Sequence, residues 1–352
     1  MDRTRRVYRW DLDKTYLRTD FDSLRGLLRA ALEKATAKVN VAGSAALLRE
    51  LQAEAGARVC IVSGSPRQMR RTLEEKLRLD GIEFDELVLK PNVQNLIRGR
   101  FKAVRDQVGY KLPALLEGRL RVEGATQETL FGDDAEADAF VYSLYADLLA
   151  GNVSVATLAE ILDHCGLYDD DLARILDLAV RVPKAAKRVG RIFIHLDAYS
   201  PPASFTPYGT RVVPIYNYFQ AAVLLFVDGH FGPAAVVRIA AELSQGYGYS
   251  LLSLANSFQD LMRRGFANAQ HVSALRLAFE APDAMLDALR PATGVIETFL
   301  QRITMIASAR GGPKTLEGGI DYLGIVRAEG PPRKWRSVAR ARQRRRAAGG
   351  PF

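Results

Sequence analysis

The strongest constraint on the fold is a series of short strand-like runs separated by helical segments. Residues 58–62 (RVCIV), 129–131 and 191–196 (RIFIHL) have little or no polar face, and residues 6–10 form a further strand-like run. Strands that are apolar on both sides are typical of a parallel sheet whose two faces are covered by helices. The sequence therefore predicts an α/β fold with a Rossmann-like parallel sheet.

Helical spacing of apolar residues predicts the segments between these runs. A strand is also expected at 86–89 and another at 212–215, and residues 221–227, bounded by Gln220 and Asp228, suggest a buried strand. The expected helices cover residues 21–32, 44–55, 66–79, 99–116, 140–149, 154–182 (one or two helices) and most of 233–304.

The domain organisation follows from this pattern and from the charge. We expect an α/β core at 1–228 with a helical insertion at about 151–187, a helical extension at 229–310, and a basic, disordered tail at 311–352. Of the net charge of +9, the window 327–346 carries +8, because it holds nine Lys or Arg and one acid. The expected core is therefore close to neutral.

Composition favours a cytoplasmic protein. No stretch approaches the roughly 18 to 20 apolar residues that span a bilayer, and the first residues carry charges without the apolar centre of a secretory signal. Only Cys60 and Cys165 occur, and Cys60 lies in an apolar run, where we expect it to pack as a small apolar side chain.

Polar residues that suit phosphoryl chemistry follow three of the expected strands. Asp11, Asp13 and Thr15 follow the first, Ser63 and Gly64 follow RVCIV, and Asp133, Asp134 and Asp138 follow residues 129–131. Lys111 lies in an expected helix between the last two groups. Open α/β sheets bind ligands at the carboxyl ends of their strands. These groups should therefore meet in one site.

In order and context, these four groups resemble the motifs of the haloacid dehalogenase (HAD) superfamily, over about residues 7–142. The resemblance implies that Asp11 is a nucleophile that is transiently phosphorylated and that Asp13 is the general acid and base. It implies a magnesium ion held by Asp11, the backbone carbonyl of Asp13 and an aspartate among Asp133, Asp134 and Asp138. Ser63, Gly64 and Thr15 would hold the phosphate, and Lys111 would pair with Asp11 and the phosphate.

A narrower resemblance is to App1-type phosphatidate phosphatases. It rests on Val62-Ser63-Gly64-Ser65-Pro66, on Lys111-Leu112 and on the spacing from Asp133 to Asp138. It implies a phospholipid or another bulky phosphomonoester as substrate. The segments between the motifs leave no room for a large lid, which also favours a large substrate. Lys14 departs from the glycine of many such phosphatases, which puts the geometry of that turn in question.

Simpler interpretations remain open for several residues. Asp11 and Asp13 could cap a turn, Asp133 and Asp134 could cap a helix that starts near Ala135, and Ser63 could be a turn residue. Lys102 and Lys90 are rivals of Lys111 for the role of the catalytic lysine. His195 fits a strand histidine better than a metal ligand.

The sequence thus predicts a magnesium-dependent phosphatase that acts on a phosphorylated substrate. Two alternatives stay open: a phosphotransferase on the same core, and a non-catalytic scaffold that binds through its basic tail. Arginines around Trp335 in residues 333–346 suit an anionic membrane surface or nucleic acid, although a merely solubilising tail is equally compatible with this composition.

Overall fold

Six parallel strands form one sheet in the computed structural model, which describes residues 5–18, 34–90, 104–122, 126–280, 301 and 319–329. The strand order is β3-β2-β1-β4-β5-β6, and every neighbouring pair is parallel. The strands are β1 (Arg5–Asp11), β2 (Ala57–Pro66), β3 (Glu86–Lys90), β4 (Thr126–Asp133), β5 (Val189–His195) and β6 (Val212–Ile215).

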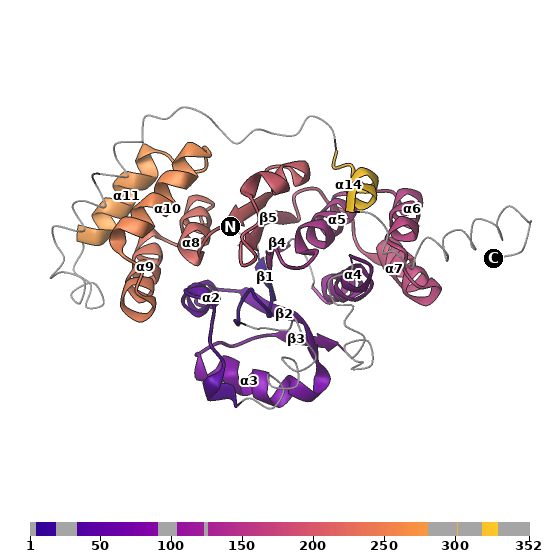
Figure 1. Ribbon diagram of the computed structural model, residues 1–352, viewed down its shortest axis with the longest axis horizontal. Coiled ribbons are helices and arrows are strands. Elements are labelled where there is room, and N and C mark those ends of the chain that lie inside the picture. Colours follow the sequence, from indigo (N-terminus) through magenta and orange to yellow (C-terminus); the bar gives the residue numbers. More distant parts are fainter. Residues whose placement is uncertain are drawn as a thin grey trace, which may run out of the picture.

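Helices cover both faces of this sheet (Figure 1). One face carries α2 (Ser44–Gln52), α3 (Arg70–Leu79), α8 (Tyr218–Val227), α9 (Pro233–Tyr247), α10 (Leu251–Arg263) and α11 (Ala269–Glu280). The other face carries α4 (Val104–Leu120), α5 (Asp138–Ala150), α6 (Val155–Cys165), α7 (Asp169–Arg181) and α14 (Tyr322–Glu329). Short 3₁₀ helices η1 (Ala35–Ala37), η2 (Arg67–Met69) and η3 (Pro202–Tyr208) complete the described elements. The expected α/β fold with a parallel sheet is confirmed.

Alternating residues of the central strands build two separate apolar cores. On the side of α8, the rings of Trp10, Phe131 and Phe193 stack across β1, β4 and β5, with centroids 4.0 and 5.1 Å apart. On the side of α5, Leu130 and Ile192 contribute to the second core. Since successive residues of a strand point to opposite faces, an apolar run such as RIFIHL supplies both cores.

Two expected elements differ from the structure. Residues 221–227, expected as a strand, belong to helix α8; this prediction is wrong. A buried helix and a buried strand can have the same unbroken apolar composition, and here the side chain of Asn217 accepts a hydrogen bond from the backbone of Gln220 and caps the helix. The helix expected at 140–149 spans Asp138–Ala150, and residues 134–137 form a turn before it, so the alternative of a helix starting near Ala135 does not hold.

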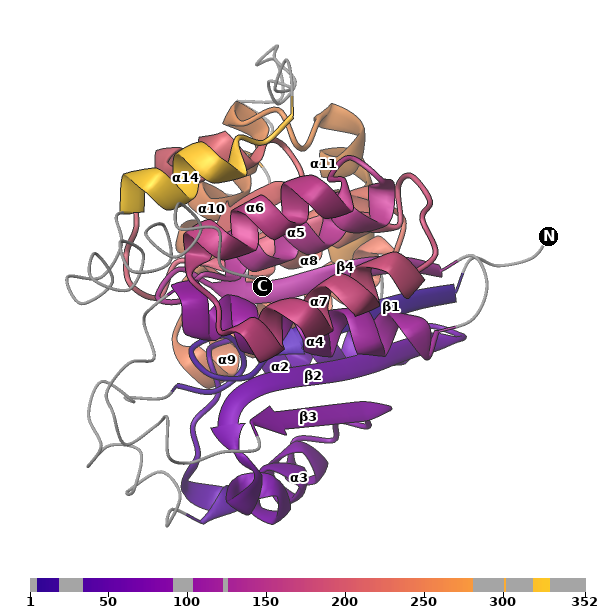
Figure 2. The ribbon, with the colours of Figure 1, turned by 90° about the vertical axis from the view of Figure 1, so that its right-hand side faces the viewer.

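Strand β2 extends further than its apolar run. It includes Ser63, Gly64 and Ser65, and its pairing with β3 shifts register between Ser63 and Pro66. Figure 2 shows the strand bending at this end. The serine residues therefore lie on the bent end of a strand rather than in a loop after it.

The two expected helical additions pack directly on the sheet domain. Helices α6 and α7, within the expected insertion at 151–187, share a core with α4 and α5, and α9–α11 share a core with α2 and α8. Helix α14 lies inside the range 311–352 that was expected to be a disordered tail, and its buried Tyr322 donates a hydrogen bond to Asp147. Expectations for residues 21–32, 99–103, 281–300, 302–318 and the basic segment 333–346 fall outside the described residues.

A buried ion pair joins β1 and β4 on the face of the sheet that α4 and α5 cover. Arg9 Nε on β1 donates to Glu128 Oε2 on β4 at 2.5 Å, and the hydroxyl of Tyr145 donates to the same oxygen at 2.8 Å. Arg119 Nη1 lies 3.6 Å from the other carboxylate oxygen. Both Arg9 and Glu128 are almost wholly buried. Gly118 of α4 makes room, because a Cβ there would collide with the guanidinium of Arg9.

Removing the charge of Glu128 should strongly destabilise the fold. In Glu128→Gln, the buried guanidinium of Arg9 loses its counter-ion, and we expect the free energy of unfolding to fall by about 3 to 5 kcal/mol. Urea unfolding followed by circular dichroism measures this loss. Glu117→Gln is the control: Glu117 pairs with Arg174 at 2.6 Å on the surface, so its loss should be below about 1 kcal/mol. Equal small losses in the two variants would contradict the account.

Candidate active site

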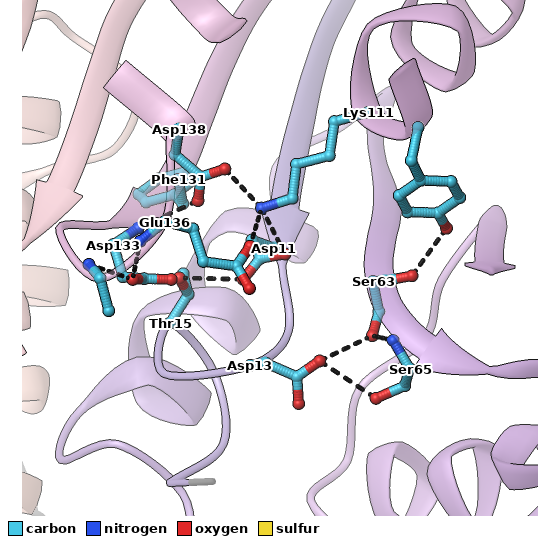
Figure 3. A network of polar contacts seen from close by, with 12 residues as sticks. Asp11, Asp13, Thr15, Ser63, Ser65, Lys111, Phe131, Asp133, Glu136 and Asp138 are labelled. Atoms are coloured by element: carbon cyan, nitrogen blue, oxygen red, sulfur yellow. Dashed lines mark hydrogen bonds and ion pairs between the residues drawn. The ribbon is translucent and has the colours of Figure 1, made fainter. Parts of the chain in front are cut away.

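The carboxyl ends of three neighbouring strands bring the candidate residues together (Figure 3). Asp11 is the last residue of β1, Asp133 is the last residue of β4, and Ser63 lies near the end of β2. These ends are adjacent because β1 lies between β2 and β4. Lys111, near the middle of α4, and Asp138, the first residue of α5, reach the same place from the covering helices.

A buried ammonium group joins the acidic side chains. Lys111 Nζ lies 3.0 Å from Asp11 Oδ1 and 2.8 Å from Glu136 Oε2, and it forms a short ion pair with Asp138. Burial alone would lower the pKa of Lys111, but the nearby carboxylates outweigh this effect and raise the pKa well above its ordinary value. Lys111 therefore carries its positive charge at neutral pH.

Gly132 allows Asp138 to approach the end of β4. A Cβ at position 132 would collide with the carboxylate of Asp138, so only glycine fits. From this position Asp138 Oδ2 accepts a hydrogen bond of 3.1 Å from the backbone N–H of Asp133. Gly132 therefore allows Asp133 and Asp138, the two acids of the expected motif, to lie close together.

Asp133 offers one free buried oxygen to this site. Its Oδ1 accepts hydrogen bonds from the backbone N–H groups of Ala135 at 2.6 Å and Glu136 at 3.2 Å. Its Oδ2 is buried and has no hydrogen-bond partner among the described residues. Such an atom is costly unless it meets a cation or a donor.

The acidic residues suit a hard divalent cation. Asp11, Asp133, Glu136 and Asp138 each offer a carboxylate oxygen, and these oxygens lie within 4.8 Å of one another. Oxygen ligands of this kind are preferred by Mg²⁺ and Ca²⁺. Together with the unpartnered oxygen of Asp133, the donor set fits the magnesium ion that the sequence led us to expect.

Burial also raises the pKa of these carboxylates, so that they bind protons more tightly than exposed carboxylates do. Burial raises the pKa of Asp11 and Asp138, and Lys111 partly offsets the increase in both. For Asp133, burial is again the main cause, and the charge of Asp138 raises the pKa further. Cation binding must therefore compete with protons, so acid should weaken it.

Asp13 is held by two serine hydroxyls rather than by this acidic cluster. Its Oδ2 accepts hydrogen bonds from Ser63 Oγ at 3.1 Å and from Ser65 Oγ at 3.0 Å. Tyr110 donates to the backbone carbonyl of Ser63 at 2.6 Å and fixes the end of β2. Burial and the charge of Glu136 raise the pKa of Asp13 to about 6, although the serine hydrogen bonds act in the opposite direction.

The turn after Asp11 is tight and is held from several sides. Thr15 Oγ1 lies 3.4 Å from Asp11 Oδ2, and the backbone carbonyl of Thr15 accepts a hydrogen bond of 2.6 Å from Tyr218. Lys14 has φ +60°, in the left-handed region that glycine adopts at little cost. Its carbonyl lies 3.2 Å from His195 Nδ1 at the end of β5. The chain therefore forms at Lys14 the kind of turn for which a glycine is suited.

Asp134 lies apart from the acidic cluster. Its carboxylate accepts hydrogen bonds from the backbone N–H groups of Ala198 at 2.6 Å and Ser200 at 2.8 Å, so it holds the loop after β5. The sequence prediction that placed Asp134 among the metal ligands is therefore not supported by its position. The side chains of the neighbouring residues Asp133 and Asp134 point in different directions, and the sequence alone does not show which of them faces the cluster.

Glu136 is the residue that sequence reasoning missed. It lies in the turn between Asp133 and Asp138, so the only signal for it was its position between the two expected ligands. Of the rival lysines, Lys102 lies outside the described residues, and Lys90 Nζ lies over the ring of Tyr110, 5.6 Å from its centroid. Gly64 contributes only its backbone, next to the two serines on β2.

No protein-family model, curated protein or solved structure matches the chain. The resemblance to HAD phosphatases thus rests on the sequence motifs alone. Within the described residues, no helix is both long enough and apolar enough to cross a membrane. Cys60 and Cys165 are both buried, as expected for Cys60.

The raised pKa of Asp13 predicts that this carboxyl lowers the free energy of unfolding of the metal-free protein as the pH rises. Between about pH 4 and pH 6 the folded state binds this proton more tightly than the unfolded state, whose carboxyl titrates near 3.8. The contribution of Asp13 to stability therefore falls as the pH rises through this window. Asp13→Asn removes the titration, so its stability relative to wild type should rise by up to about 3 kcal/mol from pH 4 to pH 7.

Chemical denaturation in EDTA, at several pH values, measures this difference. Asp134→Asn is the control, because its carboxylate lies outside the acidic cluster. A stability difference between Asp13→Asn and wild type that is independent of pH would show that the environment of Asp13 is not as described.

Proposed function

We propose that this chain is a magnesium-dependent phosphomonoester hydrolase that acts through a phosphorylated Asp11. The observation that carries the proposal is the arrangement around Asp11. A buried nucleophile contacts a buried lysine, and a second carboxylate with a pKa of about 6 follows two residues later. These are the groups that phosphoryl transfer requires: a nucleophile, a positive charge and a proton donor.

In the first step, a carboxylate oxygen of Asp11 attacks the phosphorus atom of the substrate. The bond from phosphorus to the ester oxygen breaks, and Asp13 gives its proton to that oxygen, so that an alcohol leaves. A pKa of about 6 suits this role, since the group is partly protonated near neutral pH and readily gives up its proton. Lys111 balances the charge on the phosphoryl oxygens and on Asp11.

In the second step, water attacks the phosphorus atom of the aspartyl-phosphate. Asp13, now ionised, takes a proton from this water, and the bond between phosphorus and Asp11 breaks. Ser63 and Ser65 keep the carboxylate of Asp13 in place through both steps, because each donates a hydrogen bond to it. Inorganic phosphate then leaves, and Asp11 and Asp13 return to their initial states.

A magnesium ion held by Asp11, Asp133 and the backbone carbonyl of Asp13 would supply positive charge opposite the phosphoryl group. The unpartnered oxygen of Asp133 supports this assignment. Glu136 and Asp138 belong to the same cluster, and Asp138 also holds Lys111.

Exposed apolar side chains support a bulky substrate. Tyr199 follows β5 and Tyr216 follows β6, and their exposed fractions are 91% and 52%. Val39, 55% exposed, lies beside the segment that follows β1. All three lie beyond the carboxyl ends of the strands, the edge that also holds Asp11. Exposed apolar side chains at this edge suit the apolar part of a phospholipid or of another large phosphoester.

The direct test is phosphate release from a panel of phosphoesters with Mg²⁺ and with EDTA. The panel contains p-nitrophenyl phosphate, sugar phosphates, nucleotides and phosphatidate in mixed micelles. We expect release only with Mg²⁺, and Asp11→Asn should lose at least about a thousandfold in rate because it lacks the nucleophile. Asp197→Asn, an acid in the loop after β5, is the control and should keep its activity.

The panel also separates the alternatives. Undiminished release by Asp11→Asn would refute the mechanism. Transfer of the phosphoryl group to an added alcohol in preference to water would identify a phosphotransferase. A folded protein that releases no phosphate yet binds vesicles or RNA would identify the scaffold.

A further inference from the structure

Three carboxylates surround the ammonium group of Lys111: Asp138 accepts a hydrogen bond from it, and Asp11 and Glu136 form ion pairs with it. An ammonium group has three donors, and Lys111 contacts Asp11, Glu136 and Asp138 (Figure 3). In the proposed reaction, Lys111 also has to contact an oxygen of the phosphoryl group. One of its three carboxylate partners must therefore give way when a phosphoester binds.

Only Glu136 is placed to move. The side chains of Asp11 and Asp138 are buried to 1% or less exposure, whereas 19% of the Glu136 side chain is exposed. Asp138 is further held by the backbone of Asp133, while no hydrogen bond to the Glu136 carboxylate is found among the described residues besides its contact with Lys111. The backbone N–H of Glu136 stays bound to Asp133, so a change of side-chain rotamer is enough to release Lys111.

Charge gives this movement a driving force. The cluster holds four acids around one lysine, and a phosphomonoester brings up to two further negative charges. Like charges at this distance in a buried site repel strongly. Moving Glu136 towards solvent removes one negative charge from the neighbourhood of the phosphoryl group and clears the space beside the ammonium group of Lys111.

We infer that the carboxylate of Glu136 occupies the place beside Lys111 that a phosphoryl oxygen takes when a phosphoester binds. Displacement of Glu136 then sets the affinity of the site for phosphate. This inference rests on the proposed function. Weakly charged anions do not displace Glu136, whereas a phosphoryl dianion does. Glu136 is thus a specificity-determining residue: although its carboxylate lies in the acidic cluster, the inference requires that magnesium is held without it.

Calorimetric titration of inorganic phosphate, at saturating Mg²⁺ and pH 7.5, tests the inference. We expect Glu136→Gln and Glu136→Ala to bind phosphate on the order of tenfold more tightly than wild type, because no carboxylate has to be displaced. A separate titration with Mg²⁺ alone should give the same dissociation constant for all three proteins, to within about twofold. Glu160→Gln, which removes an exposed acid on α6, should match wild type in both titrations.

The other outcomes overturn the inference in distinguishable ways. Mg²⁺ binding weakened about tenfold or more, without tighter phosphate binding, would make Glu136 a metal ligand. Equal phosphate affinity in wild type and both variants would refute displacement while leaving the proposed function intact. If neither wild type nor the variants bind phosphate and none releases it from p-nitrophenyl phosphate, the proposed function itself is wrong. Thermal unfolding of each variant verifies that it is folded.

Discussion

The ion pairs of Lys111 hold together the carboxyl edge of the sheet. Four acidic residues converge there, and three of them are wholly buried, so their mutual repulsion would be severe without a cation among them. Lys111 links α4 to the end of β1, to the start of α5 and to the turn before it. Its ammonium therefore sets both the geometry of the acids and the charge that a phosphoryl group would meet.

The sheet can bury this charge because helices α4 and α5 cover it. Arg9 and Asp11 are two residues apart on β1, so both point towards these helices. Lys111 of α4 pairs with Asp11, and Gly118 of α4 leaves space for the guanidinium of Arg9. Arg9 donates to Glu128, which also accepts a hydrogen bond from Tyr145 of α5. The opposite face, with Trp10 at its centre, is apolar and packs on α8. One face of β1 thus carries the charged pairs, and the other anchors the strand.

Sequence patterns were informative where the strand period alone decides position. Asp11 and Asp133 could be placed at the sheet edge because each ends a short strand. Sequence patterns were less informative where a turn or a helix rotation decides the position of a side chain. They did not separate Lys90 and Lys102 from Lys111, and they pointed to Asp134 where the structure has Glu136 in the acidic cluster. The strand predicted at 221–227 is a helix in the structure, because an unbroken apolar run has no period that distinguishes a buried strand from a buried helix. The prediction of disorder from residue 311 onward is wrong for helix α14, because the buried hydroxyl of Tyr322 donates a hydrogen bond to Asp147.

The central claim is that Asp11 becomes phosphorylated. Asp13→Asn lacks the base for the second step, whereas p-nitrophenolate is a good leaving group that needs no proton from Asp13 in the first step. The variant should therefore accumulate the aspartyl-phosphate when mixed with p-nitrophenyl phosphate and Mg²⁺. Peptide mass spectrometry after an acid quench locates the modified residue. The account predicts a phosphoryl group on the peptide that contains Asp11, absent when Asp11 is also replaced by Asn. A phosphoryl group on Ser63 or Ser65 instead, or none on a variant whose wild-type parent releases phosphate, would contradict it.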